Sequence, residues 1–309
     1  MTNTLPLFYF KPTLCWIDDD QLFLDAVSLH YAPEFHSLTF TNSFEAVEAL
    51  NQYQSPLNTV QFTRELTESD LYGTQEHHPI SMNIPAIKSL MQSEEKHKEI
   101  AILVSDYNMP GQTGLEVLAQ LKPLPCQKIL LTGDASHDSV VKAFNDGLIQ
   151  RFIQKNNDTA DILRKYVFDL VERHFQEKSR PLMNHLESSK PSALSDPIFI
   201  NAFNQWREKE NIVEFYLINK QGCFIAKNND GDILHFVVFS EQDKKDFLAL
   251  HDEAPEDASS LLKSFEEGVH IPFFGVDVES WDIPHAEWEQ YFYPAQVLQG
   301  RDVYYWAVV

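Results

Sequence analysis

The chain has 309 residues, a formal net charge of −22 and a hydrophobic fraction of 43%. A chain of this length typically forms two domains, each with its own core. So acidic a protein repels phosphate backbones, which argues against nonspecific nucleic-acid binding. No apolar run is long enough to span a bilayer, and the first residues lack the basic start and cleavage site of a signal peptide, so we expect a cytoplasmic protein with no membrane partner.

Short apolar runs alternate with amphipathic segments through the first half of the chain. The predicted strands are 14–17, 38–40, 101–104, 128–131 and 151–153, and the predicted helices are about 21–30, 44–53, 114–121, 137–146 and 159–178. Five strands that alternate with five helices predict a doubly wound parallel α/β sheet, covered on both faces. In such sheets, ligand sites form at the carboxyl ends of the strands.

The middle of this half is too long for the pattern. Between Asp19 and Asp106 the chain holds about 40 residues more than two strand-and-helix units need. The excess lies at about 54–97, a mostly polar stretch in which 84–92 reads as a helix. We therefore predict a partly ordered insertion there.

Three consecutive carboxylates, Asp18, Asp19 and Asp20, follow the first predicted strand. At about 4 Å and an effective dielectric near 20, each pair of unit charges repels by roughly 4 kcal/mol. A bound divalent cation or a lysine from elsewhere in the chain would offset this repulsion. Alternatively, the triplet is a solvated, acidic start to the next helix, where carboxylates suit the helix dipole.

Polar residues at the other strand ends favour a chemical role. Asp18 and Asp19 together with Asp106 form an oxygen-rich group that suits Mg²⁺. The carboxylate of Asp106 can attack a phosphorus centre and become an aspartyl phosphate. Thr132 can donate its hydroxyl to a phosphoryl oxygen, and the ammonium of Lys155 can balance the remaining charge.

Four segments resemble the receiver domain of two-component response regulators, in the order and at the spacing of that family apart from the insertion. They are WIDDD (16–20), LVSDYNMPGQTGLEVL (103–118), ILLTGDAS (129–136) and DGLIQRFIQK (146–155). The resemblance covers about residues 12–178 and implies a flavodoxin-like, five-stranded receiver. It also implies that Asp106 accepts phosphate from a sensor histidine kinase or a phosphotransfer protein.

The resemblance further implies a metal site and a switch. The implied Mg²⁺ ligands are Asp19 directly, Asp18 mostly through water, the carboxylate of Asp106, and the backbone carbonyl of Asn108. Phe152 holds the family's aromatic switch position, which moves with Thr132.

Three features depart from the family pattern. Thr113 stands where an aspartate is usual, which we interpret as a surface change of little consequence. Asn156 follows Lys155 where proline is usual; the family holds that bond cis, and a cis bond before asparagine costs about 2.5 to 4 kcal/mol. The insertion at 54–97 lengthens one connection and can carry a partner surface of its own.

The second half of the chain has a different pattern. A polar stretch with two prolines predicts a linker at 179–195, after a receiver domain at 1–178. Asp196 and Pro197 mark a helix start. Predicted strands follow at 212–218, 223–227 and 233–239, helices at about 241–251 and 256–267, and a closing hairpin at the end of the chain. Hairpin-paired strands with grouped helices predict an α+β output domain at 196–309, built on an antiparallel sheet.

The output domain carries no recognisable motif of an output chemistry. It holds 8 Lys and Arg against 21 Asp and Glu, and no helix-turn-helix with a basic recognition helix is visible, so sequence-specific DNA binding is disfavoured. We expect an output that works by interaction or ligand binding. The alternatives are an enzyme that acts on a nucleotide or small molecule, and a transcription regulator with an unrecognised DNA-binding surface.

The sequence as a whole therefore indicates an atypical response regulator. We expect phosphorylation of Asp106 to change homodimerisation, through residues about 137–178, or an output interaction, with no enzymatic activity beyond the receiver's own phosphorylation and dephosphorylation. Quorum-sensing regulators of the Lqs type, which also join a receiver to an output without a DNA-binding motif, are a subgroup that the chain resembles. The three cysteines, far apart and in apolar surroundings, predict buried, reduced thiols.

Overall fold

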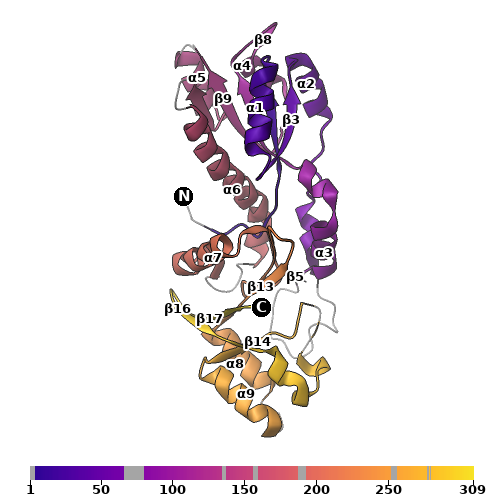
Figure 1. The fold of residues 1–309 in the computed structure, drawn as a ribbon, viewed down its shortest axis with the longest axis vertical. Helices are drawn as coiled ribbons and strands as arrows, with labels where there is room; N and C mark the ends of the chain where they lie inside the picture. Colours follow the sequence, from indigo (N-terminus) through magenta and orange to yellow (C-terminus); the bar gives the residue numbers. More distant parts are fainter. Residues whose placement is uncertain are drawn as a thin grey trace. The chain divides into compact units, whose positions relative to one another are not determined.

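The computed structural model describes residues 4–65, 80–133, 137–155, 159–186, 193–251, 256–276, 278 and 280–309. The chain forms two compact units (Figure 1). The parallel-sheet unit consists of Phe10–Asn58 and Ser93–Lys178, and the antiparallel-sheet unit of Met1–Tyr9, Thr59–Gln92 and Ser179–Val309.

The parallel-sheet unit is built on a five-stranded sheet in the order β10-β9-β6-β2-β3. Its strands are β2 Thr13–Ile17, β3 His36–Phe40, β6 Ile100–Asp106, β9 Gln127–Thr132 and β10 Arg151–Gln154. All four neighbouring pairs are parallel. This is the flavodoxin-like strand order 2-1-3-4-5, in which the order reverses between the first and third strands. The predicted fold class of this unit is confirmed.

Helices follow the strands as the apolar periodicity predicts (Figure 1). They are α1 Gln21–Tyr31, α2 Ser43–Gln52, α4 Gly114–Gln120, α5 His137–Asn145 and α6 Thr159–Leu186. The side chains of Asp20, Asn42 and Thr113 accept hydrogen bonds from the first free backbone N–H groups of α1, α2 and α4, which fixes where each helix begins. Buried apolar residues of the strands and of α4 and α5 then share one core.

The antiparallel-sheet unit is built on a six-stranded sheet in the order β1-β11-β12-β13-β17-β16. Its strands are β1 Phe8–Tyr9, β11 Ile212–Leu217, β12 Phe224–Asn228, β13 Ile233–Ser240, β16 Gln296–Gln299 and β17 Val303–Val308. All neighbouring strands are antiparallel. An antiparallel second domain is therefore confirmed as well.

Aromatic side chains hold this unit together. Helix α7 Pro197–Lys209 begins at its N-cap Asp196, as predicted. Phe203 of α7 packs against Phe224 and Phe236 of the sheet, at ring-centroid distances of 4.6 and 5.4 Å. Such rings bury large apolar areas, so they dominate the packing of this core.

Shorter elements complete both units. They are η1 Thr59–Phe62, β4 Thr63–Glu65, β5 Ile80–Met82, α3 Ile84–Gln92, η2 Glu94–Lys98, β7 Asn108–Met109, β8 Gln112–Thr113, η3 Ala193–Ser195, α8 Glu241–Leu250, α9 Glu256–Glu266, β14 His270–Pro272, η4 Ser280–Asp282, η5 His285–Tyr291 and β15 Phe292–Pro294. Helix α3 covers the residues for which the sequence predicts a helix inside the insertion.

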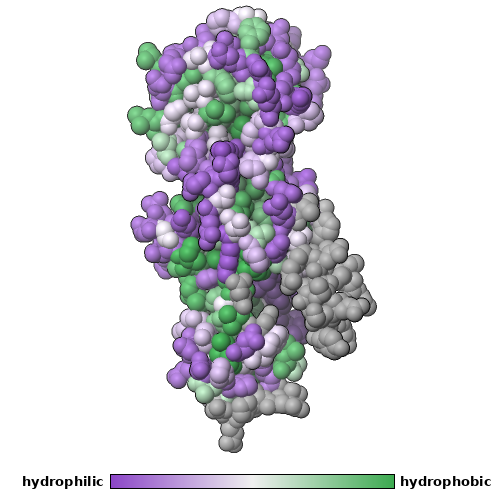
Figure 2. All heavy atoms as spheres, turned by 90° about the vertical axis from the view of Figure 1, so that its right-hand side faces the viewer, coloured by the Kyte–Doolittle hydropathy of each residue, from purple (hydrophilic) through white to green (hydrophobic). Residues whose placement is uncertain are grey.

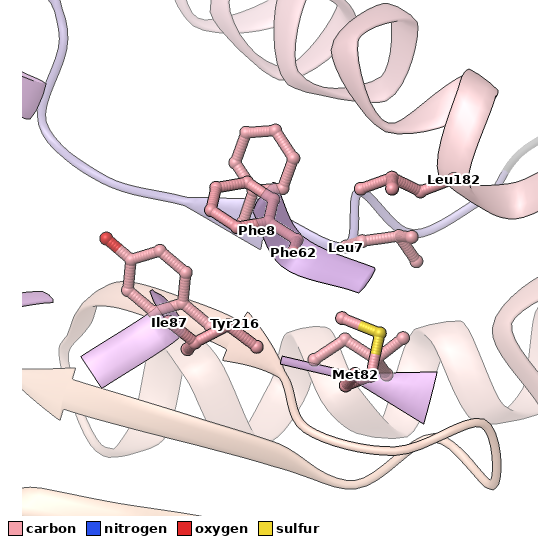
Figure 3. Close-up of a pocket in the computed structure, with 8 residues that line it drawn as sticks. Leu7, Phe8, Phe62, Met82, Ile87, Leu182 and Tyr216 are labelled. Atoms are coloured by element: carbon pink, nitrogen blue, oxygen red, sulfur yellow. The ribbon is translucent and has the colours of Figure 1, made fainter. Parts of the chain in front are cut away.

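Most of the insertion, Thr59–Gln92, and the N-terminal strand belong to the antiparallel-sheet unit. Phe8 of β1 pairs with Tyr216 of β11, and its ring packs edge-on against Phe62 at 5.1 Å. Figure 3 shows Phe62, Met82 and Ile87 of the insertion around the same apolar group. The compact units thus divide the chain differently from the expected domains 1–178 and 196–309, because apolar side chains of the insertion pack with the second sheet.

Helix α6 also differs from the expected boundary. It continues through Pro181 to Leu186 and so occupies the first part of the predicted linker at 179–195. Proline removes one helical hydrogen bond, but Leu182 and Met183 beside it are buried. The hydroxyl of Ser179 accepts a 2.9 Å hydrogen bond from the backbone N–H of Leu7. Packing of this turn therefore outweighs the local signal to end the helix.

The surface agrees with the composition. Figure 2 shows hydrophilic side chains over most of the visible face of the described residues, with smaller apolar groups between them. No helix in the described part of the chain is both long and apolar enough to cross a membrane. Cys15, Cys126 and Cys223 are buried free thiols, as predicted.

Candidate functional site

The strand register brings the predicted site residues to one edge of the parallel sheet. Asp106 ends β6 and lies beside Leu131 of β9, so that Thr132 follows directly at the same edge. The backbone N–H of Lys155 donates a 2.7 Å hydrogen bond to the carbonyl of Thr132, which places Lys155 next to it. Asp18 follows β2, the other neighbour of β6. The site therefore lies at the carboxyl ends of the strands, where the strand order reverses.

Asp18, Asp106 and Lys155 form a compact ionic group. The ammonium nitrogen of Lys155 lies 2.9 Å from Oδ2 of Asp18 and 2.6 Å from Oδ1 of Asp106. Both carboxylates are nearly inaccessible, with 2% and 6% of their surface exposed. The repulsion between the buried acids is thus offset by a lysine from a distant part of the chain, one of the two possibilities that the sequence left open.

The three consecutive aspartates have separate roles. Asp18 faces Lys155, and its other oxygen accepts a 3.0 Å hydrogen bond from the backbone N–H of Asp20. The side chain of Asp20 accepts from the N–H groups of Leu22 and Phe23 and caps α1. Asp19 is exposed. The predicted role as an acidic helix start is therefore correct for Asp20, whereas Asp18 belongs to the ionic group with Asp106 and Lys155.

The hydroxyl of Thr132 is buried and has no hydrogen-bond partner among the described residues. The exposed fraction of Thr132 is 5%. An unpaired buried hydroxyl is costly and most such groups are paired.

Phe152, the expected switch residue, is 42% exposed. The backbone N–H of Asn108 donates to Oδ2 of Asp106 at 2.9 Å.

The ionic group shifts the pKa values of its members. Burial raises the pKa of Asp106, and the nearby charge of Asp18 adds to this, although the bond from Lys155 opposes it. Burial by itself lowers the pKa of Lys155, but its bonds to Asp106 and Asp18 outweigh burial and leave that pKa raised. Lys155 therefore stays protonated, and Asp106 carries its charge at some energetic expense.

Gly114 allows the backbone to close around Asp106. Its N–H donates to the carbonyl of Tyr107 at 2.9 Å, and a Cβ at this position would lie 2.1 Å from the carbonyl oxygen of Asp106. The hydroxyl of Ser105, which the sequence analysis did not single out, donates to that carbonyl at 3.0 Å. Thr113 forms a capping box with Glu116, so this departure from the family pattern keeps a good N-cap residue.

The donor chemistry of the site fits a hard cation such as Mg²⁺, because carboxylate and carbonyl oxygens are its preferred ligands. Asp18, Asp19, Asp106 and the carbonyl of Asn108 are the residues that would hold it. In this structure Lys155 lies between two of these carboxylates. Within the described ranges, no three His, Cys, Asp or Glu side chains are arranged to hold a metal ion. Residues 134–136 and Asn156, which belong to the predicted motifs, lie outside the described residues.

A second buried carboxylate, which the sequence analysis missed, directly precedes β6, the strand that ends in Asp106. Glu99 is 1% exposed, and its Oε1 lies 2.9 Å from both His174 Nε2 and Lys178 Nζ. Ser55 and Tyr53 donate their hydroxyls to the other oxygen. Burial raises the pKa of Glu99, but the contacts with His174, Lys178 and Ser55 outweigh it and leave this pKa lowered. No sequence motif marks this group, since its members are far apart in the chain.

Comparison with known proteins gives a full-length structural match. No protein-family model matches the chain, and no curated protein is significantly similar to it. The structure of the response regulator LqsR from Legionella pneumophila is 27% identical, with a TM-score of 0.78, and the match covers 100% of this chain and 90% of that one.

Two receiver-domain structures match about half of the chain. A CheY-like receiver domain protein from Methanospirillum hungatei is 19% identical with a TM-score of 0.35, and the match covers 54% of this chain and 98% of that one. The signal receiver domain of a Vibrio parahaemolyticus protein is 14% identical with a TM-score of 0.37, over 55% of this chain and 96% of that one. The full-length likeness to LqsR, together with the flavodoxin-like sheet, supports a response regulator that contains a receiver domain.

Proposed function

We propose that Asp106 is the phosphoacceptor of this response regulator, and that a sensor histidine kinase or a phosphotransfer protein supplies the phosphoryl group. The observation that carries the proposal is the buried hydroxyl of Thr132, which has no partner among the described residues, at the same sheet edge as Asp106 and Lys155. A phosphoryl group on Asp106 would give that hydroxyl an acceptor.

The chemistry follows from the residues present. An oxygen of Asp106 attacks the phosphorus of a phosphohistidine, the P–N bond breaks, and the imidazole leaves with the bonding pair. Thr132 donates a hydrogen bond to a phosphoryl oxygen, and Lys155 balances its charge. Mg²⁺, held by Asp18, Asp19, Asp106 and the carbonyl of Asn108, would supply further positive charge to the phosphoryl oxygens.

The proposed consequence of phosphorylation is homodimerisation or a changed output interaction through residues about 137–178. An aspartyl phosphate carries up to about two negative charges where the free carboxylate carries one, and Thr132 and Phe152 respond to it. Exposed apolar side chains on α5, β10 and α6 support an interface there; they are Val141, Phe144, Phe152, Ile162 and Phe168. Exposed apolar groups of this kind mark association surfaces.

The likeness to LqsR extends through the antiparallel-sheet unit. This likeness supports the proposal that the protein is a regulator of the Lqs type, which the sequence resembles, with a role in quorum sensing. Its output acts by interaction or ligand binding.

Mass spectrometry of the intact protein tests the phosphoacceptor. Incubation with acetyl phosphate and Mg²⁺ should add one phosphate to the parent and none to Asp106→Asn. Asp25→Asn is the matched control, since Asp25 is an exposed carboxylate of α1 whose side chain accepts a hydrogen bond from Gln21 one turn away, and this variant should label like the parent. Full labelling of Asp106→Asn would reject the assignment.

Light scattering on the same samples tests the consequence. With beryllofluoride as a phosphoryl mimic, the parent should gain mass or change its hydrodynamic radius, and Asp106→Asn should do neither. Identical mass and radius, under conditions where the mimic is shown to be bound, would contradict the proposed switch and leave the phosphoacceptor assignment untouched.

A further inference from the structure

An aromatic ring takes part in the ionic group around Asp106. The ammonium nitrogen of Lys155 lies 5.1 Å from the ring centroid of Phe23, while it contacts Asp18 and Asp106 at 2.9 and 2.6 Å. Phe23 is half-buried, and the side chain of Lys155 is 35% exposed. The ammonium is therefore held by two carboxylates and the face of one ring.

The acidic triplet itself places this ring. Asp20 caps α1 and accepts a hydrogen bond from the backbone N–H of Phe23, which fixes the first turn of the helix. Leu24, the next residue, is 1% exposed and anchors the turn in the core. The position of Phe23 relative to Lys155 thus depends on the same short segment that supplies Asp18.

The ring differs from water as a neighbour of an ammonium group. Its face carries negative partial charge and attracts the cation, with no hydrogen bond to be satisfied. The ring also covers part of the ammonium surface that water would otherwise hydrate. Leucine or methionine at this position would fill much of the same space but would lack the attraction of the ring face.

We infer that Phe23 is a positioning residue that acts through Lys155: it holds the ammonium at Asp106 and slows the hydrolysis of the aspartyl phosphate. The inference rests on the proposed phosphorylation of Asp106. In the hydrolysis, the oxygen of a water molecule bonds to phosphorus and the bond from phosphorus to the Asp106 oxygen breaks. The carboxylate leaves with the bonding pair, and the protons of the water remain with the released phosphate and the solvent.

The lifetime of the phosphorylated protein tests this role in the full chain. The parent is labelled with acetyl phosphate and Mg²⁺, freed of the donor, and followed by mass spectrometry. Phe23→Leu and Phe23→Met should shorten the half-life about three- to tenfold, the factor expected for a cation–π contact at a part-exposed site. Phe23→Tyr keeps an aromatic face and should stay within about twofold of the parent.

Two further measurements separate positioning from general damage. Leu22→Ala changes a neighbouring side chain that is 79% exposed, and it should leave the half-life unchanged. In NMR spectra, the ε-methylene protons of Lys155 should show an upfield ring-current shift in the parent and in Phe23→Tyr, and lose it in Phe23→Leu and Phe23→Met.

The outcomes distinguish this inference from the proposed function. A parent that is not labelled on Asp106 would reject the proposed function itself. A labelled parent whose half-life is matched by both Phe23→Leu and Phe23→Met would overturn the inference alone. The inference would also be overturned if Phe23→Tyr shortened the half-life as much as Phe23→Leu. The effect would then follow from any change at this position.

Discussion

Strand β6 has a buried carboxylate at each of its two ends, and each pairs with a lysine. At the carboxyl end, Asp106 lies 2.6 Å from Lys155; just before the amino end, Glu99 lies 2.9 Å from Lys178. The surroundings then differ. Glu99 has partners for both oxygens and a lowered pKa, whereas Asp106 has a raised pKa.

The two ends differ in how completely their buried charged and polar groups are paired. A buried charge that is fully hydrogen-bonded and paired is stable where it lies. At the Asp106 end, a second buried acid, Asp18, shares the one lysine, and the hydroxyl of Thr132 has no bond to make in the described part of the chain. That end is therefore unsatisfied in the absence of further groups, which is typical of a site that receives a ligand or a covalent group.

The largest expected effect concerns the amino end of the strand. Glu99→Ala should lower the free energy of unfolding by about 3 to 5 kcal/mol, because it leaves His174 and Lys178 buried or half-buried without their partner. Asp106→Asn should change it by about 1 kcal/mol or less, since it removes one of two repelling acids. Urea denaturation of both variants in metal-free buffer measures the difference.

Glu177→Ala is the matched control for that experiment. Glu177 pairs with Arg173 on α6 and accepts a 2.8 Å hydrogen bond from Gln127, but its side chain is 39% exposed, so its removal should cost roughly 1 kcal/mol. Equal losses for the Glu99 and Glu177 variants would show that the buried group contributes no more than a surface pair.

The next effect is a dependence of stability on pH. Because the pKa of Glu99 is lowered in the folded protein, its contribution is complete above the unfolded value of about 4.3 and is lost as the pH falls through the folded value. Glu99→Gln should therefore be less stable than the parent at neutral pH and flatten this acid-side decline. Thermal melts between pH 7 and the acid transition of the parent measure the slope. A parallel decline in the two proteins would assign the acid sensitivity to other groups.

The smallest expected effect compares two buried threonines. Thr132→Val replaces a hydroxyl that has no partner among the described residues by a methyl group, and it should leave stability unchanged or raise it by up to about 1 kcal/mol. Thr13→Val is the control, because the hydroxyl of Thr13 donates to the carbonyl of His97 at 2.6 Å, and it should cost about 1 kcal/mol. Denaturation midpoints give both values. A clear loss in Thr132→Val would mean that its hydroxyl already has a partner.

The parallel sheet could be predicted from the sequence because its information is local. Each strand is a short apolar run that ends in a polar residue, and the order of elements along the chain then determines which ends share an edge. Asp18, Asp106, Thr132 and Lys155 are brought together in this way. The sequence motif around Asp106 then indicated which parallel-sheet fold this is, that of a receiver domain.

The rest depends on contacts that no local pattern encodes. Phe62 and Ile87 are apolar residues in a polar stretch, and nothing in the sequence says with which sheet they pack. Glu99, His174 and Lys178 lie apart in the chain and match no motif. Pro181 is a correct signal for a helix end in isolation, yet the burial of the next two residues overrides it, as tertiary packing often overrides propensity.

The edge strand β1 has a consequence for how the protein is made. Its residues are synthesised well before their hydrogen-bond partners: the backbone N–H of Leu7 donates to Ser179, 172 positions later, and Phe8 pairs with Tyr216. During translation the parallel-sheet unit can fold once Lys178 has been synthesised. The N-terminal strand and the insertion can pack only after the second sheet has been synthesised. Strand β1 therefore has no strand partner until β11 has been made, and that interval is the stage at which a chaperone would have most to protect.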